Sequence, residues 1–297
     1  MCIRDRKKAV LPVAGLGTRF LPVSKATPKE MLPIINKPLV QYAVEEAIEI
    51  GIEEIIFITS PSKYSIKKHF DFNRAIDDKL RNSGKDKLAE LANPNIFHEI
   101  DFKYINQDEQ KGLGHAILLA KDYIQDEPFA ILLPDDLFIS KISCLSQLSS
   151  IYNDTGNSVI AVNKIDPDDI HKYGVIDPGK IEANFMEINN IIEKPSRAEA
   201  PSDIAVCGRY ILNSSIFEFL EKTHADGSDE IQLTDAIKSM LSKEKILAAL
   251  YRGEKFDCGS KKGFVEATIA ISLRDNDLKN DIKSYIQNIN EINSKDN

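Results

Sequence analysis

The stretch VLPVAGLGTRFLPVSKATPKEMLPIINKP, residues 10–38, decides the fold of this chain. Its apolar, β-branched start predicts a strand that leads into a turn containing Gly15 and Gly17. Glycines adopt backbone angles that other residues avoid, so they can bring main-chain N–H groups close to a bulky anion. Arg19 offers a planar fork of donors that fits phosphate oxygens, and Lys29 adds a compact positive charge. The pattern indicates a loop that wraps a polyphosphate.

The two glycines alone do not establish a nucleotide site. A Gly-x-Gly pair by itself is more typical of a tight strand-to-helix turn. Phe20 stands where the dinucleotide-binding motif has its third glycine, and no Gly-Lys-Ser/Thr run completes a P-loop. The whole string from Ala14 to Met31, in contrast, resembles the signature of the sugar-nucleotide pyrophosphorylases. Its form AGLGTR…PKEMLP is similar to that of the bacterial UTP–glucose-1-phosphate uridylyltransferases.

Composition excludes several classes of protein. The chain has 297 residues with 42% hydrophobic and 28% charged content, which is typical of a soluble globular protein. Its net charge of −8 argues against a nucleic-acid partner, and no stretch approaches the length of a membrane span. The four cysteines have no paired spacing, which favours reduced thiols without a zinc site and predicts a cytoplasmic protein.

Apolar strands alternate with amphipathic helices along the first half of the chain. This order predicts an α/β fold with a doubly wound, mostly parallel (Rossmann-like) sheet flanked by helices. Residues 171–212 contain short, aperiodic β segments and predict a smaller β-rich layer for the sugar. From Ser260 the chain is expected to be helical to its polar end. The strands are expected at 55–59, 102–106, 129–133 and 157–165, and the intervening helices at 38–50, 63–70, 112–124 and 142–152.

The resemblance also implies a division into parts. Residues 7–275 would form the nucleotidyltransferase domain, with a nucleotide-binding half at about 7–165 and a sugar-binding part at about 166–260. Residues 276–297 would form a C-terminal helix and tail, and residues 1–6 an extension without an assigned role. Residues 71–97 are polar and are expected to form a solvated excursion outside the active site.

A second motif, QDEQKGLGHA at residues 107–116, follows the predicted strand at 102–106. The amide of Gln107 can donate and accept together, which matches the edge of a pyrimidine. A surface glutamine in a loop is the simpler interpretation of such a residue, but the resemblance implies base recognition. His115 is expected to be structural. The nucleotide-binding residues implied by the resemblance are Ala14, Gly15, Gly17, Gln107 and Gly112.

Asp135 and Asp136 follow a continuous apolar strand. Adjacent carboxylates are usually a solvated turn, but at a buried strand end they suit a hard cation such as Mg²⁺, which also binds phosphate oxygens. Side chains alternate along a strand, so both cannot easily reach one ion. The resemblance implies that Asp135 and Asp257 are the metal ligands, and that Asp136 faces the sugar.

The remaining sites come from EKP at residues 193–195, from VCGRY and from YGV. The resemblance implies that Glu193 accepts hydrogen bonds from sugar hydroxyls and that Lys194 pairs with the sugar phosphate. Gly174 and Gly208 would let the backbone approach the hexose. Asp229-Glu230 is expected in the acidic first turn of a helix, where it would suit the helix dipole.

The resemblance implies the transfer of uridylyl from UTP to α-D-glucose 1-phosphate, with UDP-glucose and pyrophosphate as products. Arg19, Lys29 and Lys194 would be the catalytic cations, and the chain would form a homodimer or homotetramer. The alternatives are a thymidylyltransferase or another sugar-1-phosphate nucleotidyltransferase, and a non-catalytic sugar-nucleotide-binding regulator on the same fold. A dinucleotide oxidoreductase fits least, because the third glycine of its motif is missing.

Overall fold

The computed structural model describes residues 8–225, 227 and 229–295. The predicted extension at residues 1–6 lies outside this part of the chain. Four strands form the parallel half of the sheet: β1 (Lys8–Pro12), β4 (Glu54–Thr59), β5 (Asp101–Asn106) and β6 (Phe129–Leu132). β1 pairs in parallel with both β4 and β6, and β4 pairs in parallel with β5. The α/β fold expected from the sequence is confirmed.

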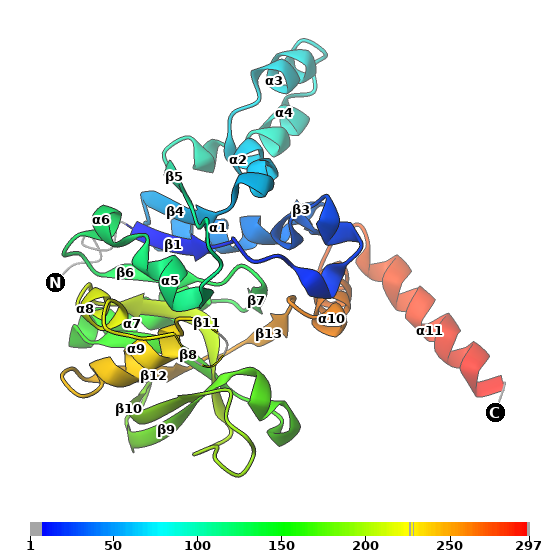
Figure 1. Cartoon of the computed structure of the whole chain (residues 1–297). Coiled ribbons are helices and arrows are strands. Elements are labelled where there is room, and N and C mark those ends of the chain that lie inside the picture. The colour runs from blue at the N-terminus through cyan, green and yellow to red at the C-terminus, as the bar shows by residue number, and fades with distance from the viewer. Residues whose placement is uncertain (1–7, 226, 228, 296–297) are drawn as a thin grey trace.

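Nine strands of the described chain form one sheet in the order β5-β4-β1-β6-β11-β8-β12-β10-β9 (Figure 1). The chain runs outward from β1 to β4 and β5, and then crosses back to β6 on the other side of β1. The order therefore reverses between β1 and β6, and ligands of open α/β sheets bind at the carboxyl ends of strands at such a point. The other strands are β8 (Ser158–Lys164), β9 (Gly174–Ile181), β10 (Met186–Glu193), β11 (Ile204–Leu212) and β12 (Ile246–Leu250).

The β-rich segment, predicted as a smaller layer added to the nucleotide-binding half, belongs to the same sheet as that half. β11 inserts between β6 and β8 and is antiparallel to both, so it joins the two halves into one continuous sheet. β9 and β10 form an antiparallel hairpin at the far edge. Parallel pairing is thus confined to the first four strands and to the β8–β12 pair.

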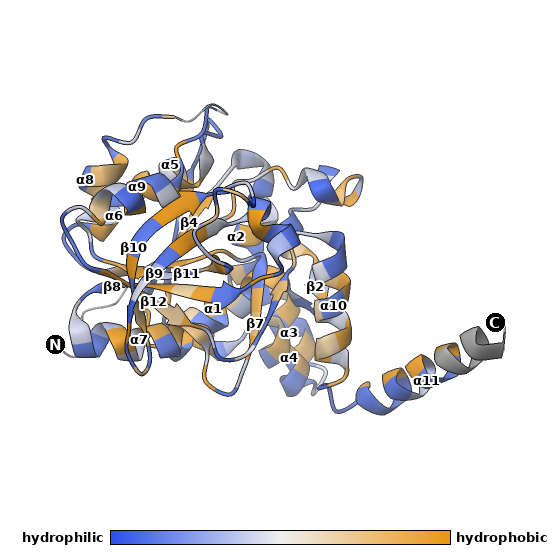
Figure 2. Ribbon diagram, turned by 90° about the horizontal axis from the view of Figure 1, so that it is seen from below, coloured by the Kyte–Doolittle hydropathy of each residue, from blue (hydrophilic) through white to orange (hydrophobic). Residues whose placement is uncertain are grey.

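Helices cover both faces of the sheet. α1 (Leu39–Glu49) and α7 (Cys144–Thr155) pack on one face, and α5 (Gly112–Leu118), α8 (Ile216–Leu220) and α9 (Leu233–Met240) pack on the other. Side chains alternate along each strand. Leu11 therefore belongs to one core and Val10 to the other. Apolar residues are concentrated on the strands in Figure 2.

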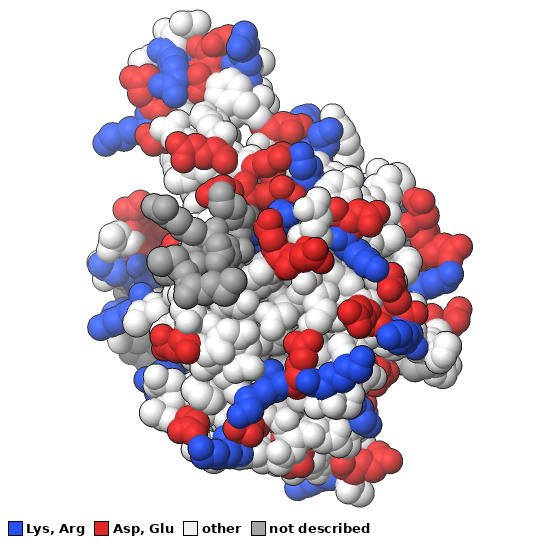
Figure 3. Space-filling model, turned by 90° about the vertical axis from the view of Figure 1, so that its left-hand side faces the viewer, with Lys and Arg blue, Asp and Glu red and all other residues white. Residues whose placement is uncertain are grey.

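Several elements lie at the periphery (Figure 1). α3 (Arg74–Arg81) and α4 (Asp86–Ala92) project from one side, where the sequence predicted a solvated excursion. α11 (Lys279–Lys295) extends from the body after α10 (Lys261–Ser272). On the face seen in Figure 3, lysine and arginine side chains are interspersed with aspartate and glutamate. The smaller elements are α2 (Tyr64–Phe70), α6 (Lys121–Ile124) and the paired strands β2 (Pro33–Ile34) and β3 (Lys37–Pro38).

One helix start was predicted wrongly. α9 begins at Leu233, so Asp229 and Glu230 precede it and do not form its first turn. The backbone of Ile231 instead bonds to the loop around α5: its N–H donates to Lys111 O at 2.8 Å, and its carbonyl accepts from Gly114 N at 2.8 Å. These bonds hold the segment extended and delay the helix. Among the described residues, no helix has the length and apolar character needed to cross a membrane.

Candidate active site

A cavity of about 370 Å³ lies where the order of the sheet reverses. Its walls come from the loop after β1, the end of β6, the start of α5 and the end of β10. The predicted site residues that line it are Ala14, Gly15, Lys29, Gln107, Gly112, Asp135, Glu193 and Lys194. The fold thus gathers residues from both predicted halves around one space.

The glycine loop is held tightly on the side of Lys29. Gly17 has a left-handed backbone, with φ of 67°, and its missing Cβ would lie 3.3 Å from Lys29 Cβ. Any other residue would therefore be strained there and would press on the lysine. Gln110, which sequence reasoning missed, donates from Nε2 to Ala14 O at 3.1 Å. The loop is positioned by contacts from remote parts of the chain.

Asp135, Asp257 and Arg19 converge on Gly259. A Cβ at Gly259 would lie 3.0 Å from both Asp135 Oδ2 and Asp257 Oδ1, and 3.6 Å from Arg19 Nη1. The two carboxylate oxygens therefore cannot be farther apart than twice 3.0 Å. The pairing of β7 (Asp136–Ile139) with β13 (Glu254–Asp257) produces this convergence, because it sets Asp257 opposite the residue after Asp135.

Asp135 is also the partner of Lys29. The Lys29 ammonium lies 2.6 Å from Asp135 Oδ2. Burial favours the neutral carboxyl, but the charge of Lys29 and its hydrogen bond outweigh burial and lower the pKa of Asp135. Burial alone would lower the pKa of Lys29, but the attraction of Asp135 and Glu30, together with the hydrogen bond to Asp135, outweighs burial and raises this pKa overall. Both groups are charged at neutral pH.

The donor set fits a magnesium ion that shares its coordination with phosphates. No group of three or more histidine, cysteine, aspartate or glutamate side chains suited to a metal occurs among the residues that the structure describes. Mg²⁺ is commonly bound by one or two carboxylates, with phosphates and water supplying the other ligands. Asp135 and Asp257 provide such a pair, whereas the protein alone does not form a complete cage.

Asp136 lies in a different environment from Asp135. Its carboxylate is 2.9 Å from the Lys255 ammonium, which lies over the Tyr173 ring at 4.9 Å. Gly208, with φ of 66°, has no room for a side chain, because a Cβ there would collide with Asp136 Oδ2. Neither Asp136 nor Gly208 is among the residues that line the cavity. The same holds for Gly17, Arg19, Gly174 and Asp257, and the expected contact of Asp136 and Gly208 with the sugar stays a prediction.

The end of β10 forms the side of the cavity that is predicted to bind the sugar. Glu193 pairs with Gly174 across the β9–β10 hairpin and accepts a hydrogen bond from Thr234 Oγ1 at 2.8 Å. Lys194 has a positive φ of 42°, and its side chain is 53% exposed. Its ammonium lies 3.3 Å from Glu193 Oε1. This side of the cavity thus carries a fixed carboxylate beside an accessible cation.

Gln107 is held in one orientation at the end of β5. Its side-chain Nε2 donates to Gly112 O at 3.2 Å and lies 3.0 Å from His115 Nδ1. A carbonyl oxygen can only accept, so the amide nitrogen must face Gly112. His115, expected to be structural, thus helps to fix the glutamine. Oε1 of Gln107 remains to accept a hydrogen bond from a ligand in the cavity that this residue lines.

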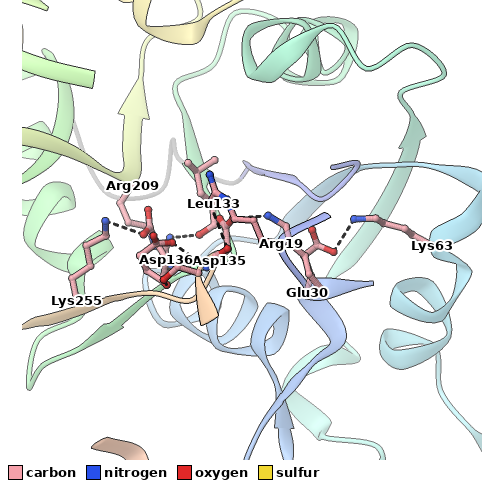
Figure 4. A network of polar contacts seen from close by, with 12 residues as sticks. Arg19, Glu30, Lys63, Leu133, Asp135, Asp136, Arg209 and Lys255 are labelled. Carbon is pink, nitrogen blue, oxygen red and sulfur yellow. Dashed lines mark hydrogen bonds and ion pairs between the residues drawn. The ribbon is translucent and has the colours of Figure 1, made fainter. Parts of the chain in front are cut away.

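Two buried ion pairs were not predicted, and Figure 4 shows the one between Lys63 and Glu30. Lys63 pairs with Glu30 at 2.8 Å, and their side chains are 7% and 2% exposed. Arg209 pairs with Glu46 at 2.9 Å. The signal for Arg209 was present in the sequence, since it is the one charged residue in the apolar strand IAVCGRYIL. Glu30 directly follows Lys29 and lines the cavity. Gln110 and Gln232 are further polar lining residues that were not predicted, and Glu230, expected mainly in a helix start, lines the cavity as well.

The fold and the charges around this cavity are those of a nucleotidyltransferase. Residues 8–273 match the family model described as nucleotidyl transferase, and the chain belongs to this family.

The most similar relatives narrow the class. The UTP–glucose-1-phosphate uridylyltransferase of Staphylococcus epidermidis is 46% identical over 288 residues, which cover 95% of this chain and 98% of the relative. A UDP-glucose pyrophosphorylase complexed with UDP-glucose has a TM-score of 0.83 at 41% identity, covering 91% of this chain and 100% of that one. A UTP-bound UGPase from Acinetobacter baumannii has a TM-score of 0.86 at 37% identity, covering 95% and 99%.

Proposed function

We propose that this nucleotidyltransferase transfers uridylyl from UTP to α-D-glucose 1-phosphate, giving UDP-glucose and pyrophosphate. The observation that carries the proposal is the convergence of Arg19, Asp135 and Asp257 on Gly259, beside Lys29. These residues provide cations for phosphates and a pair of carboxylates for a metal, at the point where the strand order of the sheet reverses. The relatives that bind UTP or UDP-glucose share the fold over nearly their whole length.

The reaction is a single in-line substitution. A phosphate oxygen of glucose 1-phosphate attacks the α-phosphorus of UTP and forms the new P–O bond. The bond from the α-phosphorus to the oxygen that bridges to the β-phosphate breaks, and pyrophosphate leaves with the electron pair. No covalent enzyme intermediate is needed, so the protein contributes positioning and charge stabilisation.

Each charged group has a role in this scheme. Arg19 and Lys29 bind the triphosphate, and Lys194 pairs with the phosphate of the sugar. Asp135 and Asp257 would hold Mg²⁺, which would supply positive charge for the phosphate oxygens when bound. Glu193 accepts hydrogen bonds from sugar hydroxyls, supported by its fixed position beside Thr234.

Gln107 selects the base. Its Oε1 accepts the N3–H of uracil, because both Gly112 O and His115 Nδ1 hold the amide nitrogen. Cytosine has no hydrogen on N3, so its N3 and Gln107 Oε1, both acceptors, would face each other without a hydrogen bond. A pocket that hydrogen-bonds its substrate rejects analogues that leave its polar groups unpaired.

The protein acts in the cytoplasm as a homodimer or homotetramer. Apolar side chains on the protruding α11 support association, since Tyr285 is 64% exposed and Ile289 is 38% exposed. An exposed apolar face on a projecting helix is suited to a second copy of the chain. Light scattering of the purified protein would measure the assembly.

A pyrophosphate-release assay over a panel of nucleoside triphosphates and sugar 1-phosphates tests the function. We expect release with UTP and glucose 1-phosphate, and much slower release when ATP, GTP or CTP replaces UTP. A preference for dTTP would identify a thymidylyltransferase. Binding of UDP-glucose without release from any pair would identify a non-catalytic regulator.

A further inference from the structure

Arg209 has the largest fully buried side chain among the described residues, and only 1% of its surface is exposed. Burying a charge is costly unless the charge is paired and all its donors are bound. Arg209 lies on β11 and does not line the cavity. Its presence in the core therefore requires an explanation beyond packing.

Its donors are directed at the loop that carries Asp135. Nη1 donates to Leu133 O at 2.8 Å, and Nη2 donates to Asp136 O at 3.0 Å (Figure 4). These two carbonyls bracket Pro134-Asp135. One rigid fork thus ties both ends of the turn that presents the proposed metal ligand. Nη1 also donates to Gly208 O at 3.0 Å.

Glu46 holds the guanidinium in place from α1. Its Oε2 accepts from Arg209 Nε at 2.9 Å, while its Oε1 accepts from Leu145 N at 2.8 Å. The arginine also lies over the Phe138 ring, 4.4 Å from its centroid. The fork is therefore fixed by a carboxylate that is itself anchored to α7.

The same turn positions the second carboxylate. Asp135 O accepts from Cys258 N at 2.7 Å, directly beside Asp257. Displacement of the Asp135 turn would therefore also shift the Asp257 turn. We propose that Arg209, held by Glu46, is a positioning residue that sets the spacing of Asp135 and Asp257 for a divalent cation bound with the nucleotide. This inference rests on the proposed function.

The test compares UTP binding with and without Mg²⁺ by calorimetry, in the absence of the sugar phosphate so that no turnover occurs. In the wild-type protein we expect Mg²⁺ to tighten UTP binding. Arg209→Lys keeps the charge but loses the fork, so we expect the metal-dependent gain to fall at least tenfold while metal-free UTP binding stays unchanged. The half-saturating Mg²⁺ concentration for pyrophosphate release should rise at least tenfold as well.

Leu212→Ala is the matched control, because it removes a fully buried side chain from the same strand without touching the loop. It should lower Tm and leave the Mg²⁺ gain unchanged. Glu46→Gln is the second variant, because Arg209 and Leu145 donate to different oxygens of the carboxylate, and the glutamine has an NH₂ group, which cannot accept, in place of one of them. Glu46→Gln should reduce the Mg²⁺-dependent gain in UTP affinity about threefold. If Arg209→Lys does not fold, this variant tests the positioning role in its place.

Four results would overturn the inference. A folded Arg209→Lys with the wild-type Mg²⁺ gain would remove Arg209 from the metal site, and so would an unchanged gain in Glu46→Gln. If Leu212→Ala lost as much of the Mg²⁺-dependent gain in UTP affinity as Arg209→Lys, the loss would be explained by lower stability alone. If wild-type UTP binding does not respond to Mg²⁺ at all, the proposed metal function fails together with this inference.

Discussion

Lys29 and Lys194 line the same cavity and differ in how firmly they are held. Lys29 has a side chain that is 22% exposed, and it pairs with Asp135 at 2.6 Å. Lys194 is 53% exposed and has Glu193 as its neighbour at 3.3 Å. The wall around Lys29, proposed to bind the nucleotide and called the nucleotide wall, therefore has its charge fixed before substrate arrives. The wall around Lys194, proposed to bind the sugar phosphate and called the sugar wall, has a cation that can adjust to its ligand.

The difference teaches where each wall contributes to the reaction. Preorganised charge in a shielded site stabilises charge that develops in the transition state. An exposed lysine is screened by water and loses side-chain entropy when it binds. We therefore expect the nucleotide wall to determine turnover, and the sugar wall to determine substrate affinity.

Substitutions in the nucleotide wall should cause the largest loss of turnover. Lys29→Ala or Arg19→Ala should lower kcat by about 10²–10³-fold, the usual effect of removing one donor to transition-state charge. Steady-state kinetics with both substrates would measure it, with circular dichroism as the control for folding. Near-normal kcat in either variant would remove that residue from the mechanism.

Loss of Lys194 should have a smaller effect of a different kind. A hydrogen bond to a charged group contributes about 1.5–3 kcal/mol, so Lys194→Ala should raise KM for glucose 1-phosphate about 10–100-fold. KM for UTP should change little. If KM for the sugar phosphate stayed constant and kcat fell as far as in Lys29→Ala, the contrast between the two walls would be wrong.

Base selection should change by about tenfold. Gln107→Ala removes one hydrogen bond to uracil, which is worth about 1 kcal/mol or more in a site that leaves polar groups unpaired. The ratio of kcat/KM for UTP to that for CTP should fall accordingly. Gln110→Ala, which removes an amide that holds Ala14 instead of facing the base, should slow the enzyme without altering the ratio. A Gln107→Ala enzyme with full uracil preference would contradict this role.

A substitution on the projecting α3–α4 pair should have almost no effect on turnover or on stability. Leu91 is 72% exposed, so Leu91→Ser should change the free energy of unfolding by at most about 0.5 kcal/mol and leave kcat unchanged. Chemical denaturation and the standard assay would measure both. A change in kcat above about twofold would indicate that this excursion takes part in catalysis.

The sequence predicted the parts of the site that follow strand ends. The positions of Gly15 and Asp135 could be derived from an apolar strand and the chemistry that comes after it, because strand ends share one edge of a parallel sheet. Asp257 and Lys194 sit in ordinary local contexts, and only the family resemblance singled them out.

Other features depend on contacts between remote segments. Glu46 meets Arg209, and Glu30 meets Lys63, only after the sheet and helices have packed. The local sequence around each residue does not predict such ion pairs between remote segments. The error at Asp229-Glu230 has the same cause, since the backbone of Ile231 bonds to the α5 loop in place of continuing into the helix.

The central claim is that segments from the two halves of the chain form a single metal-dependent transfer centre. Pyrophosphate release by Asp135→Asn, Asp257→Asn and Asp136→Asn at saturating UTP, glucose 1-phosphate and Mg²⁺ tests it most directly. We predict that the first two variants each lose most activity, about 10²-fold or more, whereas Asp136→Asn loses less. Near-normal release by either Asp135→Asn or Asp257→Asn, or an equal loss in all three, would contradict the claim.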